Sequence, residues 1–448
     1  MKPCNTTQNG EGPIVGAALA LLLGLAACGG GANDTAAAVS PAAACDVATQ
    51  NDWLRGYMDD WYLWSDASAI PEPAGYDSVQ AYFEAWRYPG DAVVPRDRWS
   101  YIESTAAYTQ FFGEGKTLGY GLFVNGIELT LPLKVRYVEP LSPAAAAGIR
   151  RGDTIVALNG RPADDIVAHD DFSVLSPAHE GDVLQVELGG GAVTTSVRLQ
   201  AVTYDLQPVS VAKVLDMPNG AKAGYLVLKD FITQAEAPLA DAFRQFRAAG
   251  ATELIIDLRY NGGGRVSTSS ALASLVSGAA QAGQVFAELR YNAKHAGAIS
   301  RFTLSSAPGP AYPRIVVLTG ARTCSASELV VNGLKPFAEV ITVGGTTCGK
   351  PFGFNPTASC GNTFSAVNFE SVNALGQGRY YSGIAPTCAV ADDFSGQLGD
   401  PAERLTAAAA GYLQTGACPA GSATTVAPRG ARSRAAAEPG DRRGMWAD

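Results

Sequence analysis

Basic residues, histidines and long apolar runs are scarce in this chain of 448 residues, and each scarcity excludes a class of function. Lys and Arg number 33 against 42 Asp and Glu, which leaves a net charge of −9 without a basic block. Nucleic-acid binding requires a basic surface, so we expect no nucleic-acid partner. The composition, 47% hydrophobic and 17% charged, is that of a globular chain long enough for about two to four domains.

Metal-ligand spacing is also absent, although the sequence contains eight cysteines. No C-x-x-C motif occurs, and the three histidines, His169, His179 and His295, lie far from the cysteines. Zinc sites are built from closely spaced cysteines and histidines. We therefore expect no metal site and no cofactor.

The N-terminus has one apolar run, Ile14–Leu25, that is too short for the roughly 20 residues of a membrane-spanning helix. Followed by small residues, such a run is typical of a secretory signal peptide. Its end, Leu25-Ala26-Ala27-Cys28, resembles the bacterial lipobox. That resemblance implies a lipid on Cys28, and Gly29 after it favours the outer membrane, facing the periplasm. The alternative is a plain signal peptide cut after Ala27.

Export changes the meaning of the remaining cysteines, because thiols pair in an oxidising compartment. The pairing of six cysteines is not fixed by sequence alone. We expect one bond to join the two ends of the folded region, one to close a loop-rich segment and one to lie beside Ser325. The expected pairs are Cys45–Cys418, Cys360–Cys388 and Cys324–Cys348.

Composition and hydrophobic patterning divide the chain into six segments. They are a signal peptide (1–27), a Gly- and Ala-rich tether (28–49), an aromatic-rich helical region (50–103), a β-rich region (104–203), a region of alternating strands and helices (204–418) and a tail (419–448). The tail is rich in Pro, Gly, Ala and Arg and has little to bury, so we expect it to be disordered.

The β-rich region contains a recognisable order of elements. Ser142–Ile149 is typical of a short helix with Ser as N-cap, Pro at the first position and Gly at its end. The turn Arg151-Gly152-Asp153, the strand Thr154–Leu158 and Asn159-Gly160 follow. This order strongly resembles a PDZ domain of the bacterial protease type. The upstream Gly119-Tyr120-Gly121-Leu122 resembles the PDZ loop whose backbone N–H groups bind the free carboxylate of a peptide.

Three unusual stretches each follow a predicted strand of the region 204–418. They are the Gly262–Gly264 run after strand 253–258, Ser325 after strand 314–319 and Lys350 after strand 340–344. Alternating strands and helices predict βαβ units with parallel strands. The carboxyl ends of parallel strands meet at one edge of the sheet, where α/β proteins bind ligands. We therefore expect these three stretches to meet at one rim.

The residue types at this rim indicate nucleophilic chemistry. A serine hydroxyl needs a base, and a buried lysine can serve, because desolvation disfavours its ammonium form. Ser325 and Lys350 are thus the candidate nucleophile and base. The N–H groups of Ala326, Gly262 and Gly263 are candidate oxyanion donors. Taken alone, Ser325–Glu328 is also a helix capping box, and only the joint placement favours catalysis.

Together these residues resemble the carboxyl-terminal processing (tail-specific) peptidases, the S41 family of serine proteases. The family pattern is matched by Asp257-Leu258-Arg259, by Asn261–Gly264, by Ser325–Glu328 and by Gly349-Lys350. The resemblance spans about 104–418. It implies an α/β, ClpP/crotonase-like catalytic core with a β-rich PDZ domain and a small N-terminal helical region. It also implies that the PDZ domain presents substrate C-termini or gates the site.

The sequence departs from this family at the residue that orients the lysine. Family members have an Asp eleven residues after the nucleophile or a Gln four residues after the lysine, whereas this chain has Pro336 and Phe354. Asn332, Glu339 or a backbone carbonyl remain candidates for orienting the Lys350 amine.

The sequence therefore predicts a lipid-anchored serine endopeptidase that cleaves exported proteins through an acyl-enzyme and recognises free C-termini. Its expected partners are protein or peptide substrates, with membrane contact through the lipid alone. The alternative is a catalytically inactive lipoprotein whose PDZ domain binds protein C-termini, which the missing Asp or Gln supports. An acyl-CoA enzyme of crotonase type shares the fold, but the PDZ-like module and the Ser–Lys pair argue against it.

Overall fold

The structure is a computed structural model that describes residues 40–126, 130–189, 194–422 and 444–446, all within one compact unit over Thr35–Asp448. The predicted signal peptide and Cys28 lie outside the described residues. Among the residues described, no helix is both long and apolar enough to cross a membrane.

The aromatic-rich N-terminal region forms helices that pack onto the later part of the chain. Its elements are α1 (Val47–Trp61), η1 (Pro73–Gly75), α2 (Val79–Trp86), β1 (Tyr101–Ser104) and α3 (Thr105–Tyr108). The side chains of Asp46 and Ser78 accept backbone N–H bonds and so begin α1 and α2. Their buried aromatic residues share one cluster with Phe352, Phe354 and Phe364. The region therefore packs against residues 352–364 of the later part of the chain.

The β-rich region has a core of its own. Its elements are η2 (Thr109–Gly113), β2 (Lys116–Gly119), β3 (Leu122–Val124), β4 (Val135–Val138), α4 (Pro143–Ala146), β5 (Thr154–Leu158), β6 (Arg161–Pro162), α5 (Ala163–His169), η3 (Ser173–Leu175), β7 (Val183–Gly189), β8 (Thr194–Gln200) and β9 (Val202–Asp205). Ser142 caps α4 through its side chain, and β5 begins at Thr154. The predicted order of helix, turn and strand is confirmed.

The region of alternating strands and helices is built on a six-stranded sheet with the order β10-β11-β12-β16-β17-β22. The strands are β10 (Val209–Asp216), β11 (Lys222–Leu228), β12 (Glu253–Asp257), β16 (Arg314–Thr319), β17 (Glu339–Gly344) and β22 (Cys388–Ala389). All neighbours from β11 onward are parallel, and β10 adds an antiparallel edge. The prediction of parallel strands is thus confirmed.

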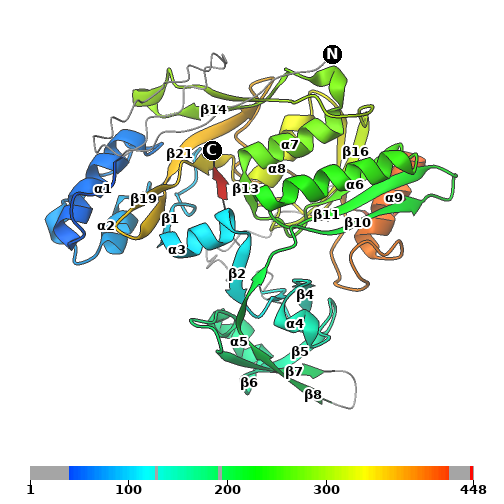
Figure 1. Ribbon diagram of the computed structural model, residues 1–448, viewed down its shortest axis with the longest axis horizontal. Helices are drawn as coiled ribbons and strands as arrows, with labels where there is room; N and C mark the ends of the chain where they lie inside the picture. The colour runs from blue at the N-terminus through cyan, green and yellow to red at the C-terminus, as the bar shows by residue number, and fades with distance from the viewer. Residues whose placement is uncertain (1–39, 127–129, 190–193, 423–443, 447–448) are drawn as a thin grey trace, which may run out of the picture. The chain divides into compact units, whose positions relative to one another are not determined.

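Helices cover both faces of this sheet (Figure 1). The helices are α6 (Glu236–Ala248), α7 (Val266–Ser277) and α8 (Ala326–Leu334) on one face and α9 (Arg404–Thr415) on the other. Successive residues of β12 point to opposite faces, so Ile256 packs with α6–α8 and Ile255 with α9. Because both faces are covered, the strands are apolar almost throughout.

A second sheet, with the order β13-β23-β18-β21-β14-β15, lies beside the first. Its strands are β13 (Gly263–Arg265), β23 (Gly444–Trp446), β18 (Phe352–Phe354), β21 (Val367–Asn373), β14 (Val285–Tyr291) and β15 (Ser300–Thr303). The remaining elements are η4 (Thr233–Ala235), η5 (Ala279–Gln281), η6 (Ala293–His295), β19 (Thr357–Ser359) and β20 (Asn362–Ser365). The expectation of a disordered tail is wrong for β23, because its backbone pairs with strands on both sides.

The disulfides in the structure differ from two of the three predicted pairs. Cys324–Cys348 forms as expected, but the other bonds are Cys45–Cys360 and Cys388–Cys418. The predicted Cys45–Cys418 and Cys360–Cys388 pairs are therefore wrong. The physical reason is the sheet topology: Cys388 lies in β22 at the edge of the main sheet, where it meets the end of α9, whereas Cys360 lies beside the tether.

A buried ion network fixes the loop that follows β12. Arg259 donates two hydrogen bonds to the Glu403 carboxylate, at 2.7 and 2.9 Å, and another to Asp257 at 3.0 Å. Arg259 and Glu403 are almost fully buried. Burial raises the pKa of Glu403, but the hydrogen bond and charge of Arg259 outweigh it and leave that pKa lowered. The same balance lowers the pKa of Asp392, which faces Arg259 and Arg151.

This network predicts that Glu403→Gln destabilises the protein by about 3 kcal/mol, because Arg259 loses its buried counter-charge. Asp241→Asn, in the exposed Asp241–Arg244 pair, should change stability by less than about 1 kcal/mol. Urea unfolding of both variants measures these differences. Equal stability of Glu403→Gln and the parent protein would contradict the role given to the pair.

The network also predicts how stability depends on pH. A carboxylate with a lowered native pKa stabilises the fold fully above its unfolded pKa, and that stability is lost as the pH falls. The free energy of unfolding should therefore decrease below about pH 5. The decrease should be smaller in Glu403→Gln, which lacks one of the titrating groups. A steeper decrease in that variant would contradict the assignment.

Candidate active site

The three strand-end loops meet as predicted. Thr323 Oγ donates to the carbonyl oxygen of Leu258 at 2.8 Å, which ties the loop after β16 to the loop after β12. The N–H of Cys348 donates to the carbonyl oxygen of Thr323 at 3.0 Å, which ties the loop after β17 to the loop after β16. Hydrogen bonds therefore join all three loops at the carboxyl edge of the sheet.

Ser325 begins α8 in a strained backbone conformation. Its φ of 61° and ψ of −116° lie in a region that residues other than glycine seldom adopt. Such strain costs on the order of 1–3 kcal/mol and gathers at functional sites. The stretch Ser325–Glu328 has capping-box geometry, but Ser325 Oγ is buried without a hydrogen-bond partner among the described residues. Its hydroxyl is therefore available for chemistry.

The carboxylate of Glu328 joins the Ser325 loop to the Lys350 loop. It accepts hydrogen bonds from the backbone N–H groups of Ser325, Gly349 and Lys350 at 2.8–2.9 Å, and one from the Thr347 hydroxyl. Burial raises the pKa of Glu328, while these donors act in the opposite direction. One buried side chain thus fixes the backbone on both sides of the candidate dyad.

A covalent bond reinforces the same connection. Cys324 directly precedes Ser325, Cys348 lies two residues before Lys350, and the two cysteines form a disulfide. The potential metal ligands of Cys324, Glu328 and Cys348 lie within 4.8 Å of one another, but the two sulfur atoms are bonded to each other. The cluster is therefore a brace between two loops in this structure.

The glycine run lies against the loop that carries Ser325. Ser327 Oγ and the N–H of Cys324 both donate to the carbonyl oxygen of Asn261, at 3.0 and 3.1 Å. The N–H of Gly263, a predicted oxyanion donor, donates to Asn261 Oδ1 at 2.8 Å and is engaged in this structure. Ala326 lies in the first turn of α8, where helix N–H groups have no partner inside the helix. Ala326 and Gly262 thus remain the candidate donors.

Lys350 is completely buried and lies between aromatic rings. Its Nζ is 4.0 Å from the centre of the Phe354 ring and 5.4 Å from that of Trp99. Phe354 occupies the position where related enzymes have a Gln, so an aromatic ring stands in place of a polar group. Of the candidates for orienting the amine, Glu339 is exposed at the far end of β17, which argues against it. Asn332 is buried, and its Nδ2 donates to the carbonyl oxygen of Gln377.

None of the three histidines takes part in this site. His295 stacks on Trp61 with ring centres 3.8 Å apart and contacts Asp60. His169 contacts Asp165 in α5, and the backbone of His179 bonds Asp182. The expectation that a histidine does not serve Ser325 agrees with these positions.

The predicted carboxylate loop Gly119–Leu122 connects β2 to β3. A Cβ on Gly121 would lie 2.0 Å from the Cβ of Ser142, and its φ is 70°, so this position requires glycine. The carbonyl oxygen of Tyr120 accepts the N–H of Ala144 at 3.0 Å. The loop is therefore held against α4. Among the described residues β3 pairs with β4 alone, so its second edge has no partner strand.

Sequence reasoning missed two groups that shape the site. Trp99, from the N-terminal region, forms one wall around the Lys350 amine. Arg151, from the predicted PDZ region, donates to Tyr260 and Asp392 beside the glycine run. Both contacts join segments far apart in the chain, and no local pattern marks them. The capping box was the one signal that pointed to Glu328.

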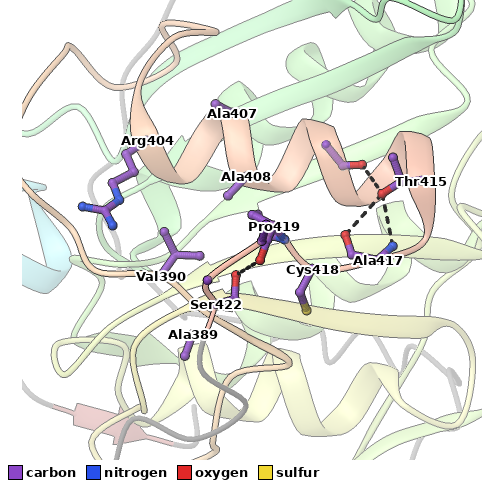
Figure 2. Close-up of a pocket in the computed structure, with 13 residues that line it drawn as sticks. Ala389, Val390, Arg404, Ala407, Ala408, Thr415, Ala417, Cys418, Pro419 and Ser422 are labelled. Carbon is purple, nitrogen blue, oxygen red and sulfur yellow. Dashed lines mark hydrogen bonds between the residues drawn. The ribbon is translucent and has the colours of Figure 1, made fainter.

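A cavity of about 700 Å³ lies beside α9, away from the candidate dyad (Figure 2). Its walls come from α9, the end of β22 and residues 417–422, and include Val390, Ala408 and Cys418. Neither Ser325 nor Lys350 lines it. Its lining is mostly apolar and carries no group suited to the chemistry of the rim.

Three family models match consecutive parts of the chain. Residues 49–101 match the peptidase S41 N-terminal domain, residues 134–187 match the PDZ domain and residues 222–387 match peptidase family S41. The last of these includes all three strand-end loops. The predicted PDZ-like region is thus confirmed as a PDZ domain, while the exact limits of the segments stay a prediction.

Curated relatives agree with these matches. The carboxyl-terminal-processing protease of Picosynechococcus sp. is 28% identical over 243 residues, which cover 53% of this chain and 55% of that protein. The chloroplastic carboxyl-terminal-processing peptidase 1 of Arabidopsis thaliana is 30% identical over 223 residues, 49% of this chain and 44% of that protein. The chain spans about half the length of the curated relatives it matches.

Solved structures share the fold. The putative S41 protease from Bacteroides fragilis is 25% identical with a TM-score of 0.63, over 81% of this chain and 97% of that one. The photosystem II D1 C-terminal processing protease has a TM-score of 0.52 at 19% identity, over 82% of this chain and 98% of that one. The predicted α/β core with a PDZ domain and N-terminal helices is therefore confirmed, and over residues 222–387 the chain is similar to peptidase family S41.

Proposed function

We propose that this protein is a serine endopeptidase in which Ser325 is the nucleophile and Lys350 the general base. The observation that carries the proposal is the junction of their two loops. A strained serine with an unpartnered hydroxyl and a fully buried lysine are held by one carboxylate and one disulfide. The family match at the same residues supports it.

The reaction follows from these positions. Lys350 Nζ takes the proton of Ser325 Oγ while that oxygen attacks the peptide carbonyl carbon. The oxyanion that develops is stabilised by the N–H groups of Ala326 and Gly262. The carbon–nitrogen bond then breaks, Lys350 returns its proton to the leaving amine, and an ester to Ser325 remains. Water hydrolyses this ester, with Lys350 again removing the proton.

Aromatic rings surround the Lys350 amine, the proposed general base. Phe354 and Trp99 exclude water around the amine and restrict where its carbon chain can lie. Exclusion of water makes an amine easier to deprotonate, which is what a general base at neutral pH requires. Aromatic packing thus favours the neutral amine that the proposed mechanism requires.

The substrate class is a protein or peptide with a free C-terminus. The PDZ domain offers the Gly119–Leu122 loop and the unpaired edge of β3, a combination that binds peptide carboxylates by strand addition. Two relatives are themselves named for C-terminal processing. We further propose that the protein acts on exported proteins, with Cys28 as its lipid anchor, on the sequence signal at 14–28.

Substitution of the dyad tests the mechanism. Ser325→Ala should reduce peptide hydrolysis to background, and Lys350→Ala should reduce kcat by about 10³-fold, because general-base catalysis contributes on that order. Lys335→Ala, an exposed lysine at the end of α8, should leave the rate unchanged. In the parent protein, kcat should rise with pH until Lys350 has lost its proton. Full activity in Ser325→Ala, or a pH-independent rate, would instead favour a binding protein without catalysis.

Two disulfides that close loops of similar length can show whether the bond beside Ser325 affects catalysis as well as stability. Cys324–Cys348 closes 24 residues and Cys388–Cys418 closes 30. Replacing either pair by serine should therefore cost about 3 kcal/mol of unfolding free energy in both cases. Only the 324/348 variant should also lose kcat, because only that bond joins the dyad loops. An equal loss of kcat in the 388/418 variant would contradict the bracing role.

Recognition of the C-terminus has a direct test with paired peptides. A substrate ending in a free carboxylate should show a kcat/KM about tenfold above that of the same peptide with an amidated end, since the amide lacks the charge that the PDZ loop binds. The peptides share every other contact and so serve as mutual controls. Equal kcat/KM values would show that substrates are recognised elsewhere.

A further inference from the structure

Two strands that border the candidate dyad leave a gap between them. Strand β13 begins directly after Gly262, and β18 begins two residues after Lys350. The two strands do not pair with each other in the sheet order β13-β23-β18. The gap therefore runs between the glycine run on one side and the strand after the catalytic lysine on the other.

Another segment of the protein's own chain, β23, fills this gap. Strand β23 pairs in parallel with β13 through Gly263–Gly444, Gly264–Met445 and Arg265–Trp446. It also pairs in parallel with β18 through Phe354 and Trp446. Figure 1 shows the short red strand β23 next to β13. Phe354 is also the residue whose ring lies 4.0 Å from Lys350 Nζ.

Both strands present edges that accept an added strand. On its far side β18 pairs with β21, and the far side of β13 is closed by Phe231, whose carbonyl oxygen accepts the N–H of Arg265. A Cβ on Gly264 would lie 2.1 Å from that same oxygen, so β13 is pressed against Phe231. The edges that face each other are the ones that β23 occupies. Unpaired edges of this kind bind extended peptides through backbone hydrogen bonds.

Both members of the proposed dyad are buried. Ser325 and Lys350 are both 0% exposed. A substrate must bring a peptide carbonyl to Ser325 Oγ, between the glycine run and Lys350, and β23 holds backbone positions along the same two strands. A peptide strand and β23 therefore compete for the same edges.

We propose that the gap between β13 and β18 is a binding channel for an extended peptide and that residues 444–446 occupy it as an inhibitor in cis. The proposal rests on the proposed function, in that the channel leads a peptide to Ser325. The ligand class is a peptide backbone in strand conformation, parallel to β13 and β18. Segment 423–443 joins the inhibitor covalently to the catalytic region, and a tethered ligand acts at an effective concentration of about millimolar.

The full chain with Ser325→Ala tests the channel by binding alone, without hydrolysis. The probe is a fluorescein-labelled peptide with the sequence of residues 439–448, and its affinity is measured by fluorescence anisotropy. Met445→Pro is added to release β23. Strand β23 has a neighbouring strand on each side, so each of its backbone N–H groups faces β13 or β18. Proline at position 445 has no N–H and therefore removes one backbone hydrogen bond between strands. Met445→Leu keeps that N–H and is the matched control.

We expect the probe to bind at least tenfold more tightly to Ser325→Ala/Met445→Pro than to Ser325→Ala or Ser325→Ala/Met445→Leu. Hydrogen exchange at residues 263–265 and 354 should accelerate in the proline variant and slow again when the probe is added. Equal affinity for all three proteins, or no probe binding to the proline variant, would overturn the proposal. Exchange changes confined to segments outside β13 and β18 would overturn it as well.

These outcomes are separable from those of the proposed function. The probe could bind as expected while neither the parent protein nor Met445→Pro with Ser325 intact hydrolyses peptides. That result would support the peptide channel and reject the peptidase activity. Hydrolysis that depends on Ser325 but has the same rate in parent and Met445→Pro would preserve the peptidase and reject the inhibitor. If both proposals hold, Met445→Pro with Ser325 intact should hydrolyse peptides at least tenfold faster than the parent at low substrate concentration.

Discussion

The carboxylate of Glu328 is the constraint on which the candidate active site depends. Three backbone N–H groups from two loops converge on it, and each of those loops carries one member of the proposed dyad. A buried carboxylate without donors would be costly, and so would three buried N–H groups without an acceptor. The carboxylate and the three N–H groups thus satisfy one another's hydrogen bonds. The geometry of Ser325 relative to Lys350 follows from this mutual satisfaction and from the adjacent disulfide.

Other parts of the chain contribute to the same rim from outside the sheet. The N-terminal region supplies Trp99, and the neighbouring Arg98 donates to the carbonyl oxygen of Cys348 at 3.2 Å. The PDZ domain supplies Arg151, which contacts Tyr260 and Asp392 next to the buried Arg259. The N-terminal region therefore contacts the loop after β17, and the PDZ domain contacts the loop after β12. Displacement of the PDZ domain would remove one of these supports.

The sequence predicted the parts of the site that local patterns determine. Apolar runs followed by helices placed Ser325 and Lys350 on parallel strand ends, because a βαβ unit admits little other geometry. Disulfide pairing was wrong for Cys45 and Cys418, because it depends on which segments approach one another in space. The positive φ of Ser325 and the aromatic walls around Lys350 also depend on tertiary contacts. Strand β23 was missed because it gains its order from the edges it joins, not from its own composition.

Phe354 links the surroundings of Lys350 to strand β23, because its ring lies beside the Lys350 amine and its backbone pairs with Trp446. A ring face attracts an ammonium ion but offers no hydrogen-bond acceptor that fixes the direction of an amine. Phe354 forms one wall around the Lys350 side chain, and β18 is the strand that carries it. A strand that adds to β18 stabilises that wall. In the proposed mechanism, a peptide bound in the channel and the Lys350 amine are therefore coupled through β18, because this strand both borders the channel and carries the ring beside the amine.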